Sequence, residues 1–179
     1  MSAIQHRVFR ELSVEEEAEE RAGWCNVEHP LDLDLDHDKV FFNDYLNLGL
    51  RVDRWRIPGN LFKATFKDAE RAYLAETGKE KLGRHDKDEL RFTVTRALRR
   101  KLMPVMRVVD LSWNLNQGVV RFWSQSAGAM AVMVDLFEDT FPLQLVPHGV
   151  YTAARERGLP DSQLDTLPQL TPSHFVLEA

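Results

Sequence analysis

Residues 105–146 constrain the fold more than any other stretch of this chain, because five local patterns follow one another there. In chain order they predict a strand over 105–113, a hairpin turn over 114–118, a second strand over 119–123, a helix over 125–139 and a last strand over 141–146. Ser124 is the expected helix cap. This β-β-α-β order is part of a ferredoxin-like layer. We therefore expect an α+β fold, an antiparallel sheet with helices on one face.

Two helices are expected before this unit. The first covers residues 60–76 and is closed by Gly78, and the second runs from Asp86 to about Met103, where Pro104 stops it. At 100° per residue, one arc of the second helix is apolar and the opposite arc is basic. The apolar arc contains Leu90, Val94, Ala97 and Leu98. Phe92 falls on the basic side, so it either packs against a neighbouring element, which we favour, or sits exposed where it could contact a ligand.

The patterns nearer the N-terminus are less regular. Ser13 to Glu16 has the spacing of a capping box and predicts a short helix that ends before Gly23. Residues 31–36 alternate Leu and Asp, which indicates an edge strand or an extended loop, and residues 40–52 predict a strand. Three arginines near the end of that strand are expected to share one face: Arg51, Arg54 and Arg56.

These patterns divide the chain into four segments. They are an acidic N-terminal segment with strands over 1–56, a basic helical segment over 57–104, the β-hairpin-α-β unit over 105–147 and a C-terminal tail over 148–179. The tail contains Pro160, Pro168 and Pro172 with little periodicity, so we expect it to be irregular or weakly docked.

The charge of the chain is segregated in the same way. Residues 51–107 hold sixteen of the 23 Lys and Arg residues against eight Asp and Glu, which gives +8, although the whole chain carries -5. Residues 1–50 carry -8 and residues 108–179 carry -5. One basic surface on an acidic molecule suits binding to a polyanion, above all nucleic acid. The alternative is that these side chains only solvate two helices.

Several classes of site receive little support. Cys25 is the only cysteine, which excludes an internal disulfide and a multi-cysteine zinc site, and we interpret it as a small buried hydrophobe beside Trp24. Asp32, Asp34 and Asp36 imitate the start of a calcium loop, but His37 stands where the turn requires Gly. No cofactor motif is visible. The chain begins without an apolar signal region and has no run long enough for a membrane helix, so we expect a cytoplasmic protein.

Catalysis is also not indicated. A metal-dependent nuclease needs clustered carboxylates, often with a lysine two positions after an acid. No lysine in this chain has Asp or Glu two places before it. Trp55, Trp113 and Trp123 could stack on nucleic-acid bases, but core positions are the more common role of such residues in strands.

Ordered patterns over residues 9–147 resemble the recombination-associated protein RdgC family. The matching stretches are 23–24 (Gly-Trp), 57–58, 78–90, 97–104, 108–113, 118–124, 136–141 and 145–147. The resemblance implies an α+β protein that forms a ring-shaped homodimer around duplex DNA in the nucleoid, binds without sequence preference and restrains the RecA recombinase. It also implies that the DNA-binding residues are Lys79, Lys81, Arg84, Lys87, Arg91, Arg99, Arg100 and Lys101. No enzymatic activity and no cofactor are expected.

The chain departs from the family in two places. Family members usually begin with a further strand and helix before the Gly-Trp site, and the larger ones continue with a second lobe. We therefore expect an open sheet edge. Relative to the family, we expect the chain to be a compact variant, a fragment or a chain with a misplaced start. Two other functions stay open: a protein-interaction module that uses the acidic Glu15 to Glu20 segment or the apolar hairpin, and, less favoured, a metal-dependent nuclease.

Overall fold

Five strands form one antiparallel sheet in the computed structural model, which describes residues 1–171. Across the sheet they are β1 (Glu20–Cys25), β3 (Tyr45–Arg54), β4 (Val105–Asn114) and β5 (Val119–Phe122), and β2 (Phe41–Phe42) pairs with the start of β3. The sheet belongs to the first of two compact units, residues 1–142. The expected α+β class and the hairpin of β4 and β5 are confirmed.

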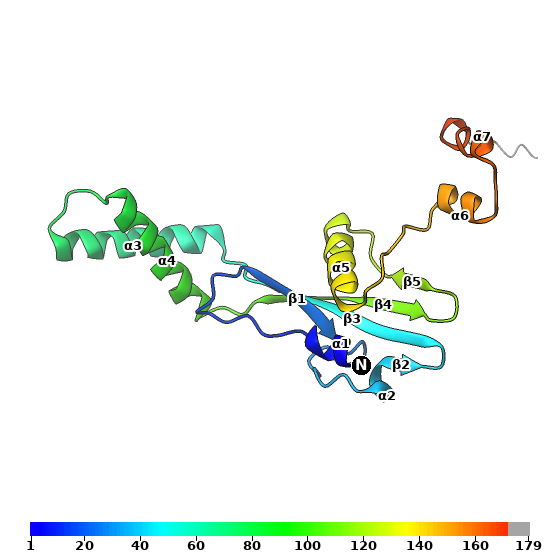
Figure 1. Ribbon diagram of the computed structural model, residues 1–179. Helices are drawn as coiled ribbons and strands as arrows, with labels where there is room; N and C mark the ends of the chain where they lie inside the picture. The colour runs from blue at the N-terminus through cyan, green and yellow to red at the C-terminus, as the bar shows by residue number, and fades with distance from the viewer. Residues whose placement is uncertain (172–179) are drawn as a thin grey trace, which may run out of the picture. The chain divides into compact units, whose positions relative to one another are not determined.

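The core lies between this sheet and helix α5 (Ala127–Thr140), as Figure 1 shows. Alternation along β3 sends Leu46, Leu48 and Leu50 to the same face, and all three are buried. Trp113 lies opposite Leu46 in β4, and its ring contacts the edge of Phe137 at a centroid distance of 5.2 Å. The apolar side of α5 thus covers this part of the sheet face.

The end of the predicted β-β-α-β unit differs from the expectation. Residues 141–146 form no strand, so the described part of the chain contains no complete ferredoxin-like unit. Pro142 has no N–H to donate to a ladder, which disfavours pairing there. The helix cap also moves: Ser126, and not Ser124, accepts a hydrogen bond from the backbone N–H of Ala129. Ser124 instead accepts from the N–H of Ser126.

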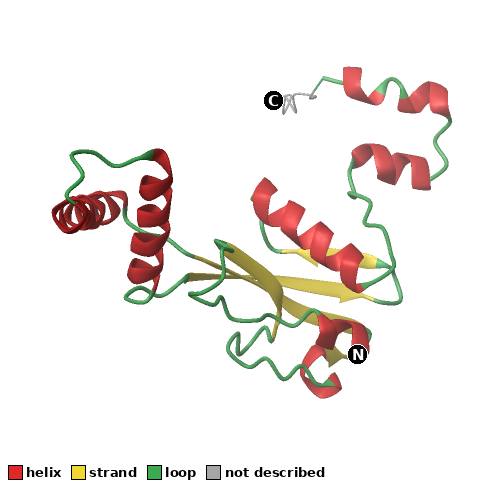
Figure 2. Ribbon diagram, turned by 60° about the vertical axis from the view of Figure 1, so that its left-hand side comes forward, coloured by secondary structure: helices red, strands yellow, loops and turns green. Residues whose placement is uncertain are grey.

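A pair of helices is inserted between β3 and β4 and projects beyond their ends in both views (Figures 1 and 2). We call α3 (Gly59–Thr77), α4 (Arg84–Arg99) and their connecting loop the helical arm. Gly78 closes α3 with φ of +66°, as predicted from its position. The second helix ends at Arg99, earlier than the expected Met103. Pro104 has no N–H to donate to the carbonyl of Arg100, and its ring would clash with that carbonyl in a continued helix.

The arm buries few of its side chains. Val94 and Leu98 of α4 are buried, whereas α3 has no buried residue. The expectation that Phe92 packs in a neighbouring element is wrong, since its side chain is 47% exposed and contacts the guanidinium of Arg96, 5.4 Å from the ring centroid. Two helices alone present too little surface to enclose every apolar residue between them.

The N-terminal residues protect part of the β1 edge. After α1 (Ser2–His6), the carbonyl of Arg7 accepts from the N–H of Trp24 at 2.9 Å, and the N–H of Phe9 donates to the carbonyl of Trp24 at 2.8 Å. A Cβ atom on Gly23 would lie 2.4 Å from the Phe9 Cα atom. The edge is therefore not fully open, and Gly23 is needed for the close approach of the segment that covers it.

Three other N-terminal expectations change. Residues 13–19 contain no helix, residues 31–36 form the loop alternative rather than a strand, and residues 40–52 split into β2 and β3. Asn43, with φ of 50°, lies in the turn between those strands, and the short helix α2 (His37–Val40) precedes them. The helix fails at Ser13 because the acidic side chains that follow contact arginines elsewhere in the fold.

The described residues from 143 to 171 belong to the second unit. The tail is more ordered than expected, with α6 (Val150–Glu156), α7 (Asp161–Leu164) and a 3₁₀ turn at Leu167–Gln169. Leu164 is buried. Of the three tail prolines, Pro172 lies outside the described residues.

Candidate nucleic-acid interface

The positive charge of residues 51–107 is concentrated where the helical arm joins the sheet. The outer part of the arm, residues 59–91, holds eight Lys and Arg against seven Asp and Glu, a net charge of +1. Residues 51–58 and 92–107 hold eight against one, a net charge of +7. We call these two stretches the arm root. The basic segment is thus a basic root that supports a nearly neutral outer arm.

The acidic segment Glu15 to Glu20 folds onto this root. Glu15 forms ion pairs with Arg96 and with Arg100, the latter at 2.8 Å. Arg99 donates to the backbone carbonyl of Glu16 at 2.7 Å, and Glu20 lies 3.7 Å from Arg54. Part of the positive charge is consequently neutralised within the chain before any ligand arrives.

The predicted DNA-binding residues on the arm are all exposed, but they differ in whether they form ion pairs. Lys79 forms a 2.7 Å ion pair with Asp86. This contact and a hydrogen bond donated by Tyr73 lower the pKa of Asp86, and the same ion pair and a hydrogen bond that Lys79 donates to Tyr73 raise the pKa of Lys79. Arg91 lies 3.6 Å from Asp88. No ion pair within residues 1–171 involves the other three, which are Lys81, Arg84 and Lys87.

The last three predicted residues lie at the arm root, in different environments. Arg99 is only 6% exposed, and its guanidinium lies over the Trp55 ring at 5.7 Å. Arg100 is exposed but paired to Glu15, whereas Lys101 is exposed and has no ion pair among the described side chains. Arg99 supports the junction between arm and sheet, so the structure removes it from the surface that a ligand could reach.

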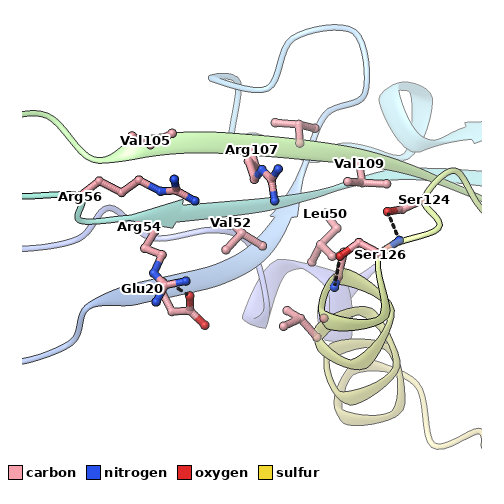
Figure 3. A pocket seen from close by; sticks show the side chains of 14 residues that line it. Glu20, Leu50, Val52, Arg54, Arg56, Val105, Arg107, Val109, Ser124 and Ser126 are labelled. Carbon is pink, nitrogen blue, oxygen red and sulfur yellow. Dashed lines mark hydrogen bonds and ion pairs between the residues drawn. The ribbon is translucent and has the colours of Figure 1, made fainter. Parts of the chain in front are cut away.

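A pocket of about 510 Å³ opens on the α5 face of the sheet, beside the arm root (Figure 3). The β3–β4 register places Arg107 opposite Val52 and Val105 opposite Arg54, so both arginines belong to this face. Arg56 follows just beyond the strand and extends over the same surface. We call this site the arginine pocket, after Arg54, Arg56 and Arg107.

The sequence predicts that Arg51, Arg54 and Arg56 share one face of the strand, and the structure separates Arg51 from the other two. Arg51 and Arg54 are three residues apart and therefore point to opposite faces of β3. Arg51 is buried on the far face, where it forms a 2.7 Å ion pair with Asp53 and donates to the carbonyl of Pro30. The expectation that Arg51 shares a face with Arg54 and Arg56 is wrong.

The first turn of α5 and an apolar floor complete the pocket. Ser126, Gly128 and Ala129 line one side, and the first turn of this helix contains no acidic residue. The floor is formed by valines from two strands and α5: Val52, Val105, Val109 and Val132. The only carboxylate among the lining residues is Glu20. Chemically, the site offers guanidinium donors next to an apolar surface.

The other candidate sites of the sequence, for metal ions and at Cys25, receive no support as binding sites. Among residues 1–171, no three His, Cys, Asp or Glu side chains gather in a way that could hold a metal ion. The Lys39 ammonium lies 2.8 Å from Asp32 and 3.5 Å from Asp34, which lowers the pKa of Asp32 and places a cation within the calcium-like motif. Cys25 is fully buried, as expected, and burial raises its pKa to about 11.

Comparison with known proteins leaves the family open. No protein-family model matches this chain, and no curated protein matches its sequence significantly. No helix between residues 1 and 171 is both long and apolar enough to cross a membrane. Any functional conclusion therefore depends on the residues themselves and on the resemblance of their ordered patterns to the RdgC family.

Arg107 was not predicted as a site residue. It lies at the end of the basic segment and in a strand pattern, where an isolated arginine carries no signal of its own. Only the pairing of β3 with β4 brings it next to Arg54, across an insertion of some fifty residues. Period-two alternation in each strand could have predicted the faces, but not the register.

Proposed function

We propose that this protein is an RdgC-like, sequence-independent DNA-binding protein that acts in recombination as a homodimer and restrains RecA. Its location would be the cytoplasm, in association with the nucleoid, and it would perform no catalysis. The observation that carries the proposal is the net charge of +7 at the arm root in a chain whose total charge is -5. The resemblance to the RdgC family supports it independently.

The chemistry of the exposed cations agrees with this proposal. Lys81, Arg84 and Lys87 lie in the arm loop and along the start of α4, and none of them has an ion pair in the described structure. Such side chains neutralise phosphates and release condensed counterions without reading base edges. Arg56, Lys101 and Arg107 add unpaired charge at the root, as far as the described residues extend.

The test is fluorescence anisotropy of a labelled random-sequence duplex, titrated with the full chain at several salt concentrations, with and without magnesium. We expect saturable binding, equal affinity for unrelated sequences and a logarithmic salt slope of about -0.9 for each neutralised phosphate. The DNA should stay intact in magnesium. Sedimentation of the same samples measures the dimer.

Absence of binding at low salt would overturn the proposal. Degradation of the duplex only in magnesium would instead favour the nuclease. Charge reversal of Arg84 and Lys87 together should weaken binding and reduce the slope, whereas reversal of Arg155 and Arg157, in the second unit, is the matched control.

A protein-interaction module is the second candidate, and one apolar surface favours it. The Trp123 side chain is 68% exposed, and it lies opposite Asp110 on the sheet face away from α5, the face that also presents Met106 and Val119. A Trp123→Ser variant should lose affinity for RecA filaments in a titration if this surface binds them. Unchanged RecA affinity would exclude Trp123 from that role.

A further inference from the structure

The arginine pocket carries positive charge that the fold does not neutralise. Arg56 and Arg107 form no ion pair among the residues that the structure describes, and Arg54 meets only Glu20, at 3.7 Å with both side chains about half exposed. On the opposite face the fold provides Arg51 with a buried carboxylate, Asp53, at 2.7 Å. An arginine cluster with a purely structural role would be expected to have such partners.

The spacing of these side chains suits one shared anion. Arg54 and Arg107 are diagonal neighbours on adjacent antiparallel strands, a relation in which Cβ atoms lie roughly 7–8 Å apart. Arginine side chains are long enough to bring their guanidinium groups together across that distance. Arg56 reaches over the same space from beyond the end of β3 (Figure 3). Planar guanidinium groups match phosphate oxygens in a bidentate fork.

The remaining walls are compatible with a phosphate ester. The first turn of α5 has no acidic side chain, and at Gly128 a Cβ atom would lie 4.0 Å from the Ser126 hydroxyl oxygen. A helix N-terminus favours negative charge, which adds to the effect of the arginines. The valine floor is apolar, and a volume of about 510 Å³ lies within the usual range for small-molecule pockets. A sugar attached to the phosphate would therefore contact valine side chains.

We propose that the arginine pocket binds a phosphate group of a nucleic-acid strand, with Arg107 and Arg56 as its main ligands and Arg54 as the third. This inference rests on the proposed DNA-binding function and deepens it, because it moves the strongest contact from the helical arm to the sheet. Glu20 competes with the phosphate for Arg54, so bound DNA displaces it.

The test compares Arg107→Ala and Arg56→Ala with Arg121→Ala. Arg121 is an exposed arginine of β5, pairs with Ser112 and faces away from the pocket, so the control changes the same charge on the same sheet. In the anisotropy assay, we expect the affinity of each pocket variant for DNA to fall about tenfold. Its salt slope should become less steep by roughly 0.9 for each phosphate that is no longer neutralised. Arg121→Ala should stay within about twofold, on the scale of an exposed charge. Arg107→Lys, which keeps the charge but loses the fork, should be intermediate.

Two outcomes separate this inference from the proposed function. If the wild type binds DNA and the Arg107 and Arg121 variants weaken it equally, the pocket is overturned and DNA binding stands. A calorimetric titration with thymidine 5′-phosphate and with inorganic pyrophosphate tests whether the pocket binds small free phosphates instead of a nucleic-acid strand. Arg107-dependent binding of these small anions without any DNA binding would overturn the nucleic-acid source. No binding of either kind would overturn both proposals.

Discussion

At the scale of single residues, the contact between Trp24 and Thr140 joins the edge strand to α5. The Trp24 indole donates to the Thr140 hydroxyl at 2.8 Å, and both side chains are buried. Thr140→Val keeps the shape but removes the acceptor, which leaves a buried N–H unpaired. We expect a loss of about 1–3 kcal/mol in the free energy of unfolding. Urea denaturation measures it.

Thr140→Ser is the matched control because it retains the hydroxyl and loses only a methyl group, at a cost of about 1 kcal/mol. Equal stability of the valine variant and the wild type would show that the hydrogen bond contributes nothing net.

Cys25 provides a second prediction at this scale. Burial raises the pKa of its thiol from 9.0 to about 11. At pH 8 the native chain should therefore react with an aromatic disulfide reagent about 100-fold more slowly than the unfolded chain, since this rise in pKa reduces the thiolate population by that factor. Stability should fall as pH rises from 9 towards 11, because the unfolded state loses its proton first. Rapid labelling of the folded chain at pH 8 would contradict the burial.

At the scale of elements, the link between α3 and α4 predicts the acid response of the helical arm. Asp86 accepts hydrogen bonds from Lys79, Tyr73 and the Gly83 N–H, and these contacts lower its pKa below the usual 3.8. A lowered pKa gives stability that is complete above the unfolded value and is lost as pH falls through the folded value. The protection of amides at the start of α4 against hydrogen exchange, relative to an unfolded chain at the same pH, should fall below pH 3.8.

Asp86→Asn removes the charge and should make this pH response flat, with faster exchange near neutral pH. Asp88→Asn is the control, since Asp88 pairs only with Arg91 within the same helix, at 3.6 Å, among the described side chains. Identical exchange profiles in the two variants would show that the Asp86 contacts do not hold the arm.

At the scale of the whole molecule, the acidic segment neutralises part of the root charge. Glu15 neutralises Arg96 and Arg100. If the proposed DNA binding is correct, Glu15→Gln should raise affinity and steepen the salt slope by about 0.9 for each additional phosphate that the freed arginines neutralise. The anisotropy assay measures both. Glu17→Gln, the same change two residues away at an exposed position with no ion pair in the described structure, should have little effect.

Equal increases in affinity for the Glu15 and Glu17 variants would assign the effect to net charge alone. A thermal melt of both variants is also needed, because the Glu15 contacts help to join the N-terminal segment to the arm root.

The sequence by itself determined the two helices of the arm, the hairpin of β4 and β5 and the placement of basic charge in residues 51–107. These features depend on local periodicity and on residues such as Gly78 and Pro104, whose backbone preferences act without help from distant parts of the chain. The helix of residues 125–139 was also found for this reason, with its cap displaced by two residues.

Tertiary structure alone decided which charged side chains a ligand can meet. Arg99 is buried under Glu16, Arg51 is paired on the far face, and Arg107 joins the pocket only through the β3–β4 register. The acidic residues after Ser13 favour a helix locally, but their contacts with distant arginines outweigh that preference. Strand register and long-range ion pairs depend on residues far apart in the chain, so no local pattern encodes them.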